Sequence, residues 1–346
     1  MKLNRNHLLY IEDLEKILQT KNLNLLKDKS ILITGATGLL GVCLIDALMY
    51  WNEQGGNVMV YAVGRNRERA CERLGLYFDT PLFQFIEQDV QEELPKELSI
   101  DYIIPAASNT HPLAYSQYPI ETMLVNLKGA EHALNKAYEC GATVLYPSTV
   151  EVYGNARGED VFTEDYTGKL NLSTSRACYT ESKRACEALC QSYMAEKGVN
   201  VKIVRLSRVF GPTMLESDSK ASSQFIKNAL RGEDIVLKSE GKQFFSYTYV
   251  ADAVGAMLYV LLNGECGVPY NISNSACNVH LRDFAAYCAE TCGKKVVFDL
   301  PTETERKGFS IAQQAILDNE RLRTMGWEPK YTMKDAVERT IQILQS

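Results

Sequence analysis

Short apolar runs alternate with amphipathic stretches through the first two thirds of the chain. Apolar runs that are rich in β-branched residues are typical of strands buried on both faces. The stretches between them repeat apolar residues every three or four positions, which predicts helices. Because parallel strands need crossover connections, the alternation predicts an α/β fold with a doubly wound parallel sheet. The predicted strands cover 30–34, 58–63, 83–89, 102–107, 143–147 and 201–206, and the clearest helices cover 39–51 and 67–76.

The two ends of the chain depart from this pattern. Apolar residues at helical spacing over 9–27 predict a helix before the first strand, so we expect 1–28 to form a helical extension. After Gly211 and Pro212 the alternation is less regular, which predicts a smaller α/β lobe. The expected division is a main domain over 29–210, to which 243–265 return, and a lobe formed by 211–242 and 266–346.

A glycine-rich turn, T-G-A-T-G-L-L-G over 34–41, joins the first predicted strand to the next helix. Gly35 allows a tight exit from the strand, Gly38 lets the backbone approach a pyrophosphate, and Gly41 permits close packing of helix on strand. The helix N-terminus then offers N–H donors and a positive dipole end to the phosphates. This arrangement predicts a site for NAD or NADP, with further contacts from Thr37, Leu39 and Leu40.

The end of the second predicted strand bears on the choice of cofactor. NAD sites of this kind usually place a carboxylate there for the ribose 2′-hydroxyl, but the chain reads Val63-Gly64-Arg65-Asn66. Arg65 could bind the 2′-phosphate of NADP, stack on adenine, or be a solvated residue at the start of a helix. Both cofactors therefore stay open at this point.

A second motif carries acid–base chemistry. Tyr179 and Lys183 are four residues apart, which places them on one face of a predicted helix. Tyrosine ordinarily has a pKa near ~10, so it needs a neighbouring cation to act as a base at neutral pH. Lys183 can supply that charge. A hydroxyl in the segment P-S-T-V-E-V-Y-G over 147–154, which follows a predicted strand, can hydrogen-bond the substrate oxygen that Tyr179 deprotonates.

These motifs, in this order, resemble the extended short-chain dehydrogenase/reductase family of the NAD-dependent epimerase/dehydratase type. The resemblance extends over 29–340 and implies a Rossmann fold with a substrate-binding C-terminal lobe. It places Thr149 at the catalytic Ser/Thr position, Lys183 on the cofactor ribose and Asp89 on adenine. It also implies a homodimer through a four-helix bundle formed by the segments 121–138 and 176–196. The remaining implied cofactor contacts are Asn66, Val90, Ala106, Ala107, Ser108, Asn126 and Tyr179.

Within that family the chain looks most like nucleotide-sugar 4-epimerases, UDP-glucuronate decarboxylases and 4,6-dehydratases. All three reactions begin with removal of the sugar 4-hydroxyl proton by the tyrosine and passage of the C4 hydride to the nicotinamide, a redox-neutral cycle that suits NAD. Dehydratases carry Asp and Glu after the threonine, where this chain has Val150 and Glu151. Val150 cannot protonate a leaving hydroxyl, so epimerisation or decarboxylation is favoured over dehydration. Glu151 is a base at C5, an anchor for a ring hydroxyl, or a solvated loop residue.

Two residues that bind substrate in the resembled enzymes are missing. Phe245 stands where decarboxylases and many epimerases have an arginine after G-x-Q-x, and the segment 205–212 lacks the asparagine of R-x-F-N-x-Y-G-P. Cations elsewhere could replace them, because diphosphate recognition needs only charges and donors placed in the cleft. His111 has no partner in the sequence and is interpreted as structural. The candidate substrate contacts are Ser148, Arg208, Lys220, Lys242 and Arg306.

Two other classes of function stay open. The missing anchors and Arg65 also fit an NADP-dependent reductase or dehydrogenase of a non-sugar carbonyl. A non-catalytic NAD(P)-sensing protein is a third reading, but a sensor has no need of the base Tyr179.

Composition and charge narrow the remaining classes. With 46% hydrophobic and 23% charged residues, the chain has ordinary globular composition, and its net charge of −6 argues against nucleic-acid binding. No apolar run approaches the ~18 residues needed to cross a bilayer, and early charges argue against a secretory signal. The ten cysteines are scattered without C-x-x-C or nearby histidines, which predicts reduced thiols, no metal site and a cytoplasmic protein.

Overall fold

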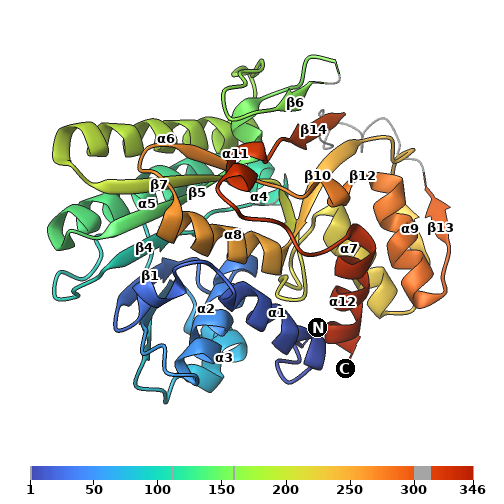
Figure 1. The fold of residues 1–346 in the computed structure, drawn as a ribbon. Helices are drawn as coiled ribbons and strands as arrows, with labels where there is room; N and C mark the ends of the chain where they lie inside the picture. The colour runs from blue at the N-terminus through green and yellow to red at the C-terminus, as the bar shows by residue number, and fades with distance from the viewer. Residues whose placement is uncertain (1, 111, 159, 300–312, 346) are drawn as a thin grey trace.

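A parallel sheet of seven strands forms the centre of the structure (Figure 1). The computed structural model describes residues 2–110, 112–158, 160–299 and 313–345. The strand order is β11-β7-β5-β4-β1-β2-β3, and the predicted doubly wound α/β fold is confirmed. The strands are β1 (Ser30–Thr34), β2 (Met59–Gly64), β3 (Phe83–Glu87), β4 (Tyr102–Pro105), β5 (Thr143–Thr149), β7 (Asn200–Leu206) and β11 (Pro269–Ile272).

The chain reverses its direction across the sheet between β1 and β4. It proceeds outward from β1 to β2 and β3, and then returns to place β4 on the other side of β1. Such a reversal leaves a crevice at the carboxyl ends of the two strands, where doubly wound sheets bind their ligands. The glycine-rich turn follows β1 and the segment 106–108 follows β4, so both lie at this edge of the sheet.

Helices cover both faces of the sheet, as a buried parallel sheet requires. The helices α5 (Pro119–Cys140) and α6 (Ala177–Lys197) pack against each other and against β5 on one face. The helices α2 (Leu39–Asn52) and α8 (Val250–Asn263) lie on the other face (Figure 1). The short helix α3 (Arg67–Leu74) follows β2. None of the described helices combines the length and the apolar character that a membrane crossing demands.

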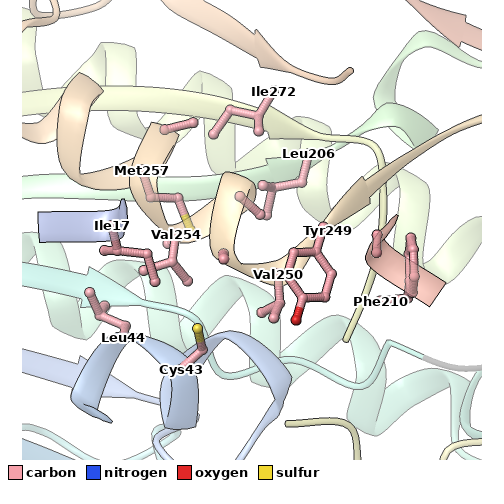
Figure 2. Close-up of a cluster of buried hydrophobic side chains, with 14 of the residues drawn as sticks. Ile17, Cys43, Leu44, Leu206, Phe210, Tyr249, Val250, Val254, Met257 and Ile272 are labelled. Atoms are coloured by element: carbon pink, nitrogen blue, oxygen red, sulfur yellow. The ribbon is translucent and has the colours of Figure 1, made fainter. Parts of the chain in front are cut away.

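Alternation along the central strand supplies both hydrophobic cores. Leu32 of β1 joins the core beneath α5 and α6, whereas Ile31 and Ile33 join the core on the α2 and α8 side. Side chains of a strand point alternately to its two faces, so one short apolar run can serve both layers. Figure 2 shows part of the second core, to which α2, α8, β7 and β11 contribute Cys43, Leu44, Val254, Met257, Leu206 and Ile272.

The C-terminal lobe is built around β10 (Phe244–Tyr249). This strand pairs antiparallel with β12 and parallel with β14 and β8. Three helices, α7, α9 and α12, pack against one another beside this sheet. The elements of the lobe and of the segments that join it are β6 (Val161–Phe162), β8 (Arg208–Phe210), α7 (Ala221–Leu230), β9 (Ile235–Leu237), β12 (Asn278–His280), α9 (Leu281–Cys292), β13 (Val296–Phe298), β14 (Gln314–Leu317), α11 (Glu320–Thr324) and α12 (Met333–Gln345). The short helix α4 (Pro112–Gln117) belongs to the main domain, where it precedes α5 and contacts it.

The strand β11 differs from the expected assignment of its residues to the lobe. It pairs with β7 at the edge of the seven-stranded sheet. The crossover helix α8 carries the chain back from β10 to this edge, so the strand after α8 completes the main sheet. The remaining domain boundaries stay a prediction.

The N-terminal extension is helical, but it is not the single helix predicted over 9–27. The helix α1 (Leu8–Leu18) ends early, and a short 3₁₀ helix η1 (Leu23–Leu26) follows it. The helix has already ended at Leu18 when the chain reaches Asn22, which precedes η1 in a left-handed conformation with φ 64°. Asparagine tolerates this region better than most residues, and no right-handed helix can continue through it.

A buried carboxylate joins this extension to the lobe. Asp13 on α1 is 1% exposed and accepts hydrogen bonds from the hydroxyls of Tyr249 and Tyr331. It also pairs with Arg339 of α12, whose Nη2 lies 2.7 Å from Asp13 Oδ1. Burial raises the pKa of Asp13, and these hydrogen bonds and the arginine charge oppose the rise. One side chain thereby connects α1, β10 and α12.

We expect Asp13→Ala to destabilise the fold by about 3–5 kcal/mol, because it leaves the Arg339 charge and two tyrosine hydroxyls without their buried partner. The matched control is Glu12→Gln. Glu12 contacts the same arginine at 3.1 Å but is 51% exposed, so its loss should cost about 0–1 kcal/mol. Urea unfolding monitored by circular dichroism measures both changes. Equal, small effects of the two substitutions would contradict the role given to Asp13.

Candidate active site

The glycine-rich turn after β1 has the geometry of a phosphate-binding loop. Gly35 has φ 67°, and a Cβ there would lie 2.8 Å from the backbone of Ala106 and Ala107. A Cβ at Gly41 would lie 2.5 Å from the carbonyl oxygen of Gly35. At Gly38, by contrast, a Cβ would meet only that same carbonyl oxygen within 4 Å. Gly35 and Gly41 therefore allow close packing of the backbone. Gly38 leaves an open surface beside the N-terminus of α2, which no side chain caps, and this surface fits a pyrophosphate.

The residues at the end of β2 form an ion-pair cluster. Arg65 Nη1 lies 2.9 Å from Glu121 Oε1 and 3.6 Å from Asp89 Oδ2. The hydrogen bond with Glu121 is the largest influence that raises the pKa of Arg65. Asn66 caps α3, because its side chain accepts a hydrogen bond from the N–H of Arg69 at 2.7 Å. Arg65 is thus already paired with Glu121 and Asp89, and Asp89 is the residue that the family resemblance places on adenine.

The segment after β4 is held against the glycine-rich turn. The N–H of Ala107 donates to Thr34 Oγ1 at 3.1 Å. On α5, the amide nitrogen of Asn126 donates to Ser182 Oγ at 2.8 Å. Its buried carbonyl oxygen has no hydrogen-bond partner among the described residues. The structure therefore brings the expected cofactor-lining segment to the turn, with one acceptor of Asn126 unused.

The predicted catalytic residues meet beneath this edge of the sheet. Tyr179 on α6 is 8% exposed, and the side chain of Thr149, at the end of β5, lies near enough to lower the pKa of the phenol. Lys183, one helical turn further along, is 5% exposed and donates to the carbonyl oxygen of Pro147 at 2.8 Å. Its Nζ also lies 4.9 Å from the centre of the Tyr146 ring. A hydroxyl, a phenol and an ammonium group are therefore gathered in one buried place.

Burial dominates the titration of these groups. It raises the pKa of Tyr179 well above its ordinary value, the charge of Glu151 adds to the rise, and the hydrogen bond from Thr149 opposes it. Burial likewise lowers the pKa of Lys183, because a charged ammonium loses hydration there. A tyrosine in this setting can act as a base only when positive charge stands near it.

A second tyrosine in the site was not found from the sequence. Tyr115 on α4 stacks on Tyr179, with ring centres 4.8 Å apart and an angle of 22° between the planes. Its pKa is raised, chiefly by burial. No motif surrounds Tyr115, and its place in the site depends on how the short helix α4 folds onto α6. Sequence spacing alone contains no signal for this contact.

Glu151 and Arg208 form the polar edge of the site. Arg208 Nη2 lies 3.8 Å from Glu151 Oε1, and the guanidinium carbon lies 3.6 Å from the centre of the Phe245 ring. Arg208 Nη1 is buried and has no hydrogen-bond partner among the described residues. The same is true of the hydroxyl of Ser148. Two of the candidate substrate contacts thus have free hydrogen-bonding capacity.

A comparison with known protein families agrees with this arrangement. A sequence profile described as the NAD dependent epimerase/dehydratase family matches residues 31–273. The chain belongs to this family. Among curated relatives, UDP-glucuronic acid decarboxylase 1 of Xenopus tropicalis is 31% identical over 317 residues, covering 90% of this chain and 71% of that protein. UDP-glucuronic acid decarboxylase 6 of Arabidopsis thaliana is 30% identical over 311 residues, covering 89% and 86%.

Solved structures of epimerases and dehydratases share the fold. UDP-glucuronic acid 4-epimerase from Bacillus cereus, in complex with UDP-glucuronic acid and NAD, has a TM-score of 0.77 at 20% identity, covering 91% of this chain and 98% of that one. dTDP-glucose 4,6-dehydratase from Bacillus anthracis, in complex with NAD, has a TM-score of 0.75 at 20% identity, covering 91% and 96%. At these identities the likeness establishes the fold, and the predicted Rossmann fold of the epimerase/dehydratase family is confirmed.

The other cations predicted for substrate binding in this epimerase/dehydratase family member are placed differently from Arg208. The Lys242 side chain is 70% exposed and pairs with Glu240. Lys220 precedes α7 and pairs with Asp218 at 3.3 Å. Arg306 and His111 lie outside the described residues. Within the described chain, no three His, Cys, Asp or Glu side chains are grouped so that they could bind a metal ion.

We expect Gly38→Asp to weaken dinucleotide binding by about 10- to 1,000-fold, because a carboxylate about 4 Å from a phosphate charge costs about 1.4–4 kcal/mol. The matched control is Gly75→Asp, since Gly75 has an ordinary helical φ of −58° and open space around its Cβ position. Fluorescence titration with the dinucleotide measures both. Unchanged binding in a folded Gly38→Asp protein would overturn the assignment of the turn.

Proposed function

We propose that this epimerase/dehydratase family member oxidises a nucleotide sugar to a transient ketone at C4, and that its net reaction is decarboxylation of a nucleotide hexuronate. The observation that carries the proposal is the burial of the Tyr179 phenol one helical turn from the buried Lys183, whose ammonium is fixed by the carbonyl oxygen of Pro147 on the strand that ends at Thr149. The named activity of relatives that align over 90% of the chain supports decarboxylation.

The first step is deprotonation of the sugar 4-hydroxyl by Tyr179. The glycine-rich turn and the segment after β4 would hold the dinucleotide, and a bound nicotinamide would supply positive charge and reversible acceptance of the C4 hydride. Thr149 holds the substrate oxygen, and the ammonium charge of Lys183, one helical turn away, favours the phenolate form of Tyr179. The ammonium stays in place because the carbonyl oxygen of Pro147 accepts its hydrogen bond at 2.8 Å.

The ketone at C4 then makes the carboxylate at C6 a leaving group. The C5–C6 bond breaks, CO₂ departs, and the electron pair of that bond forms an enolate with its charge on the C4 oxygen. C5 next takes up a proton drawn from water, and we assign its delivery to Glu151, two residues after Thr149. Val150, between them, is 5% exposed and carries no proton to give to a leaving 6-hydroxyl, so loss of water is disfavoured.

Epimerisation at C4 is the second candidate, favoured by the pairing of Glu151 with Arg208. An epimerase needs only rotation of the ketone between removal and return of the hydride, and no acid or base at C5. A carboxylate engaged by a neighbouring cation is compatible with that chemistry. Both candidates use the same three residues for the oxidation of C4.

Product analysis distinguishes these reactions. With NAD present, we expect UDP-glucuronic acid to lose the mass of CO₂, with the product sugar identified by NMR. An unchanged mass with inverted stereochemistry at C4 would support the epimerase, and loss of water would contradict both candidates.

We expect Tyr179→Phe to lower turnover by about 10²–10⁴-fold, as for a general base. Thr149→Val removes one hydrogen bond to a developing charge and should cost about 10- to 100-fold.

We further propose NAD as the cofactor. A 2′-phosphate near Arg65 would meet Glu121 and Asp89, both already bound to the same guanidinium. The arginine that suggested NADP therefore has its charge balanced by two carboxylates, and a third anion there would be repelled. This environment suits the uncharged 2′-hydroxyl of NAD.

We expect Glu121→Gln to strengthen NADP binding by about fivefold, or ~1 kcal/mol for an exposed ion pair, and to leave NAD binding unchanged. Glu131→Gln is the matched control, because Glu131 lies on the same helix with an exposed side chain. Equilibrium titration of both dinucleotides gives the ratio of affinities. An unchanged ratio would show that the pair does not determine cofactor choice.

We also propose a cytoplasmic homodimer joined through α5 and α6. The two helices already pack against each other, and Met123 and Leu124 on α5 are 36% and 38% exposed. Apolar side chains on such a surface are typical of a helix pair that meets a second copy across a two-fold axis. The ten free cysteines support a reducing compartment.

We expect a dimeric mass at micromolar concentration, and a shift toward monomer in Leu124→Lys because a charge would enter the apolar contact. The control is Leu25→Lys, an exposed apolar residue of η1 remote in sequence from both helices. Analytical ultracentrifugation measures the mass of each variant. A monomeric parent protein, or dissociation caused equally by both substitutions, would refute this interface.

A further inference from the structure

The guanidinium group of Arg208 is held in place but incompletely bonded. Its planar face lies on the Phe245 ring, with 3.6 Å between the guanidinium carbon and the ring centre. The strands that carry these residues are neighbours, since β8 and β10 pair in parallel with Arg208 opposite Tyr247. The aromatic face stabilises the cation and fixes its plane. Phe245 thus serves as a platform that sets where the edge of the guanidinium points.

The edge of this guanidinium has unused donors. Nη2 lies 3.8 Å from Glu151, which is an ion pair but too long for a hydrogen bond. Nη1 is buried without a partner in the described part of the chain. Leaving a buried donor unpaired costs about 1–3 kcal/mol, so native structures retain such groups where a ligand or water completes them. The planar fork of donors in arginine matches the two oxygens of a carboxylate.

Arg208 lies close to the end of β5, where Thr149 and Glu151 stand. Thr149, which contacts Tyr179, pairs in register with Leu206 on the adjacent strand. Arg208 follows Leu206 by two residues, and Glu151 follows Thr149 by two. The segments that continue these two strands, a 3₁₀ helix over Val150–Tyr153 and the strand β8, therefore bring the carboxylate and the cation to 3.8 Å from each other just beyond Thr149.

We propose that Arg208 binds the carboxylate at C6 of the sugar and thereby selects nucleotide hexuronates over nucleotide hexoses. This inference rests on the proposed function, because it assumes a sugar whose C4 lies at Tyr179. A carboxylate in the plane of the guanidinium satisfies the unpaired Nη1 donor. The guanidinium would also reduce the repulsion between the substrate carboxylate and Glu151, because Arg208 would lie next to both carboxylates. When CO₂ leaves, the group that Arg208 holds leaves with it, so the product is bound less tightly than the substrate.

Calorimetric titration tests this in the Tyr179→Phe background, which prevents turnover, with NAD present. Three ligands are compared: UDP-glucuronic acid, UDP-glucose and UDP. We expect Arg208→Gln to weaken UDP-glucuronic acid by about 10- to 100-fold, the effect of a hydrogen bond to a charged group. UDP-glucose and UDP should bind as before. Arg208→Lys keeps the charge but not the planar pair of donors, so its affinity for UDP-glucuronic acid should lie between that of the parent protein and that of Arg208→Gln.

The matched control is Arg231→Gln, an exposed arginine that pairs with Glu233. It should leave the affinities for all three ligands unchanged, and circular dichroism checks that each variant is folded. Equal weakening of all three ligands by Arg208→Gln would place Arg208 on the diphosphate and overturn the proposal. No weakening of any ligand would overturn it as well. If the Tyr179→Phe protein binds none of the three, the proposed function itself fails and this inference falls with it.

Discussion

The parallel register of the central sheet determines where chemistry can occur in this molecule. Thr34 pairs with Pro105, and Thr149 pairs with Leu206, so the four strands β1, β4, β5 and β7 end at one edge. Side chains and loops that are far apart in sequence converge there because every strand runs in the same direction. Three of these strands continue into parts of the site: the glycine-rich turn after β1, the segment after β4, and Arg208 of β8 after β7. Thr149 is the last residue of the fourth strand, β5.

Exclusion of water then gives the gathered groups their properties. Tyr179 and Lys183 are both nearly fully buried, and burial shifts the pKa of each toward its neutral form. A phenol so placed is inert until a cation and a hydrogen-bonded substrate oxygen favour its anion. The same low-dielectric surroundings make an unpaired donor costly, so Arg208 Nη1, which has no partner in the described part of the chain, bears on the nature of the ligand.

The parts of the site that depend on local order could be predicted from the sequence. The turn at 34–41 and the Tyr179–Lys183 pair each lie within one strand–helix junction or one helical turn, where spacing fixes geometry. Contacts between distant elements left no such signal. Tyr115 reaches Tyr179 through the folding of α4, and the helix predicted over 9–27 ends at Leu18, before the left-handed Asn22. The return of β11 to the main sheet likewise depends on the path of α8.

Phe245 stands where the resembled enzymes have an arginine, and under our proposal Arg208 supplies that charge from the neighbouring strand. In the sheet of the lobe, β8 and β10 lie beside each other, and Arg208 is in register with Tyr247, two residues from Phe245. Successive residues alternate faces of a strand, so positions 245 and 247 share one face and Arg208 can lie across the ring of Phe245. A sequence motif records which strand carries a charge, whereas a substrate responds only to where that charge stands.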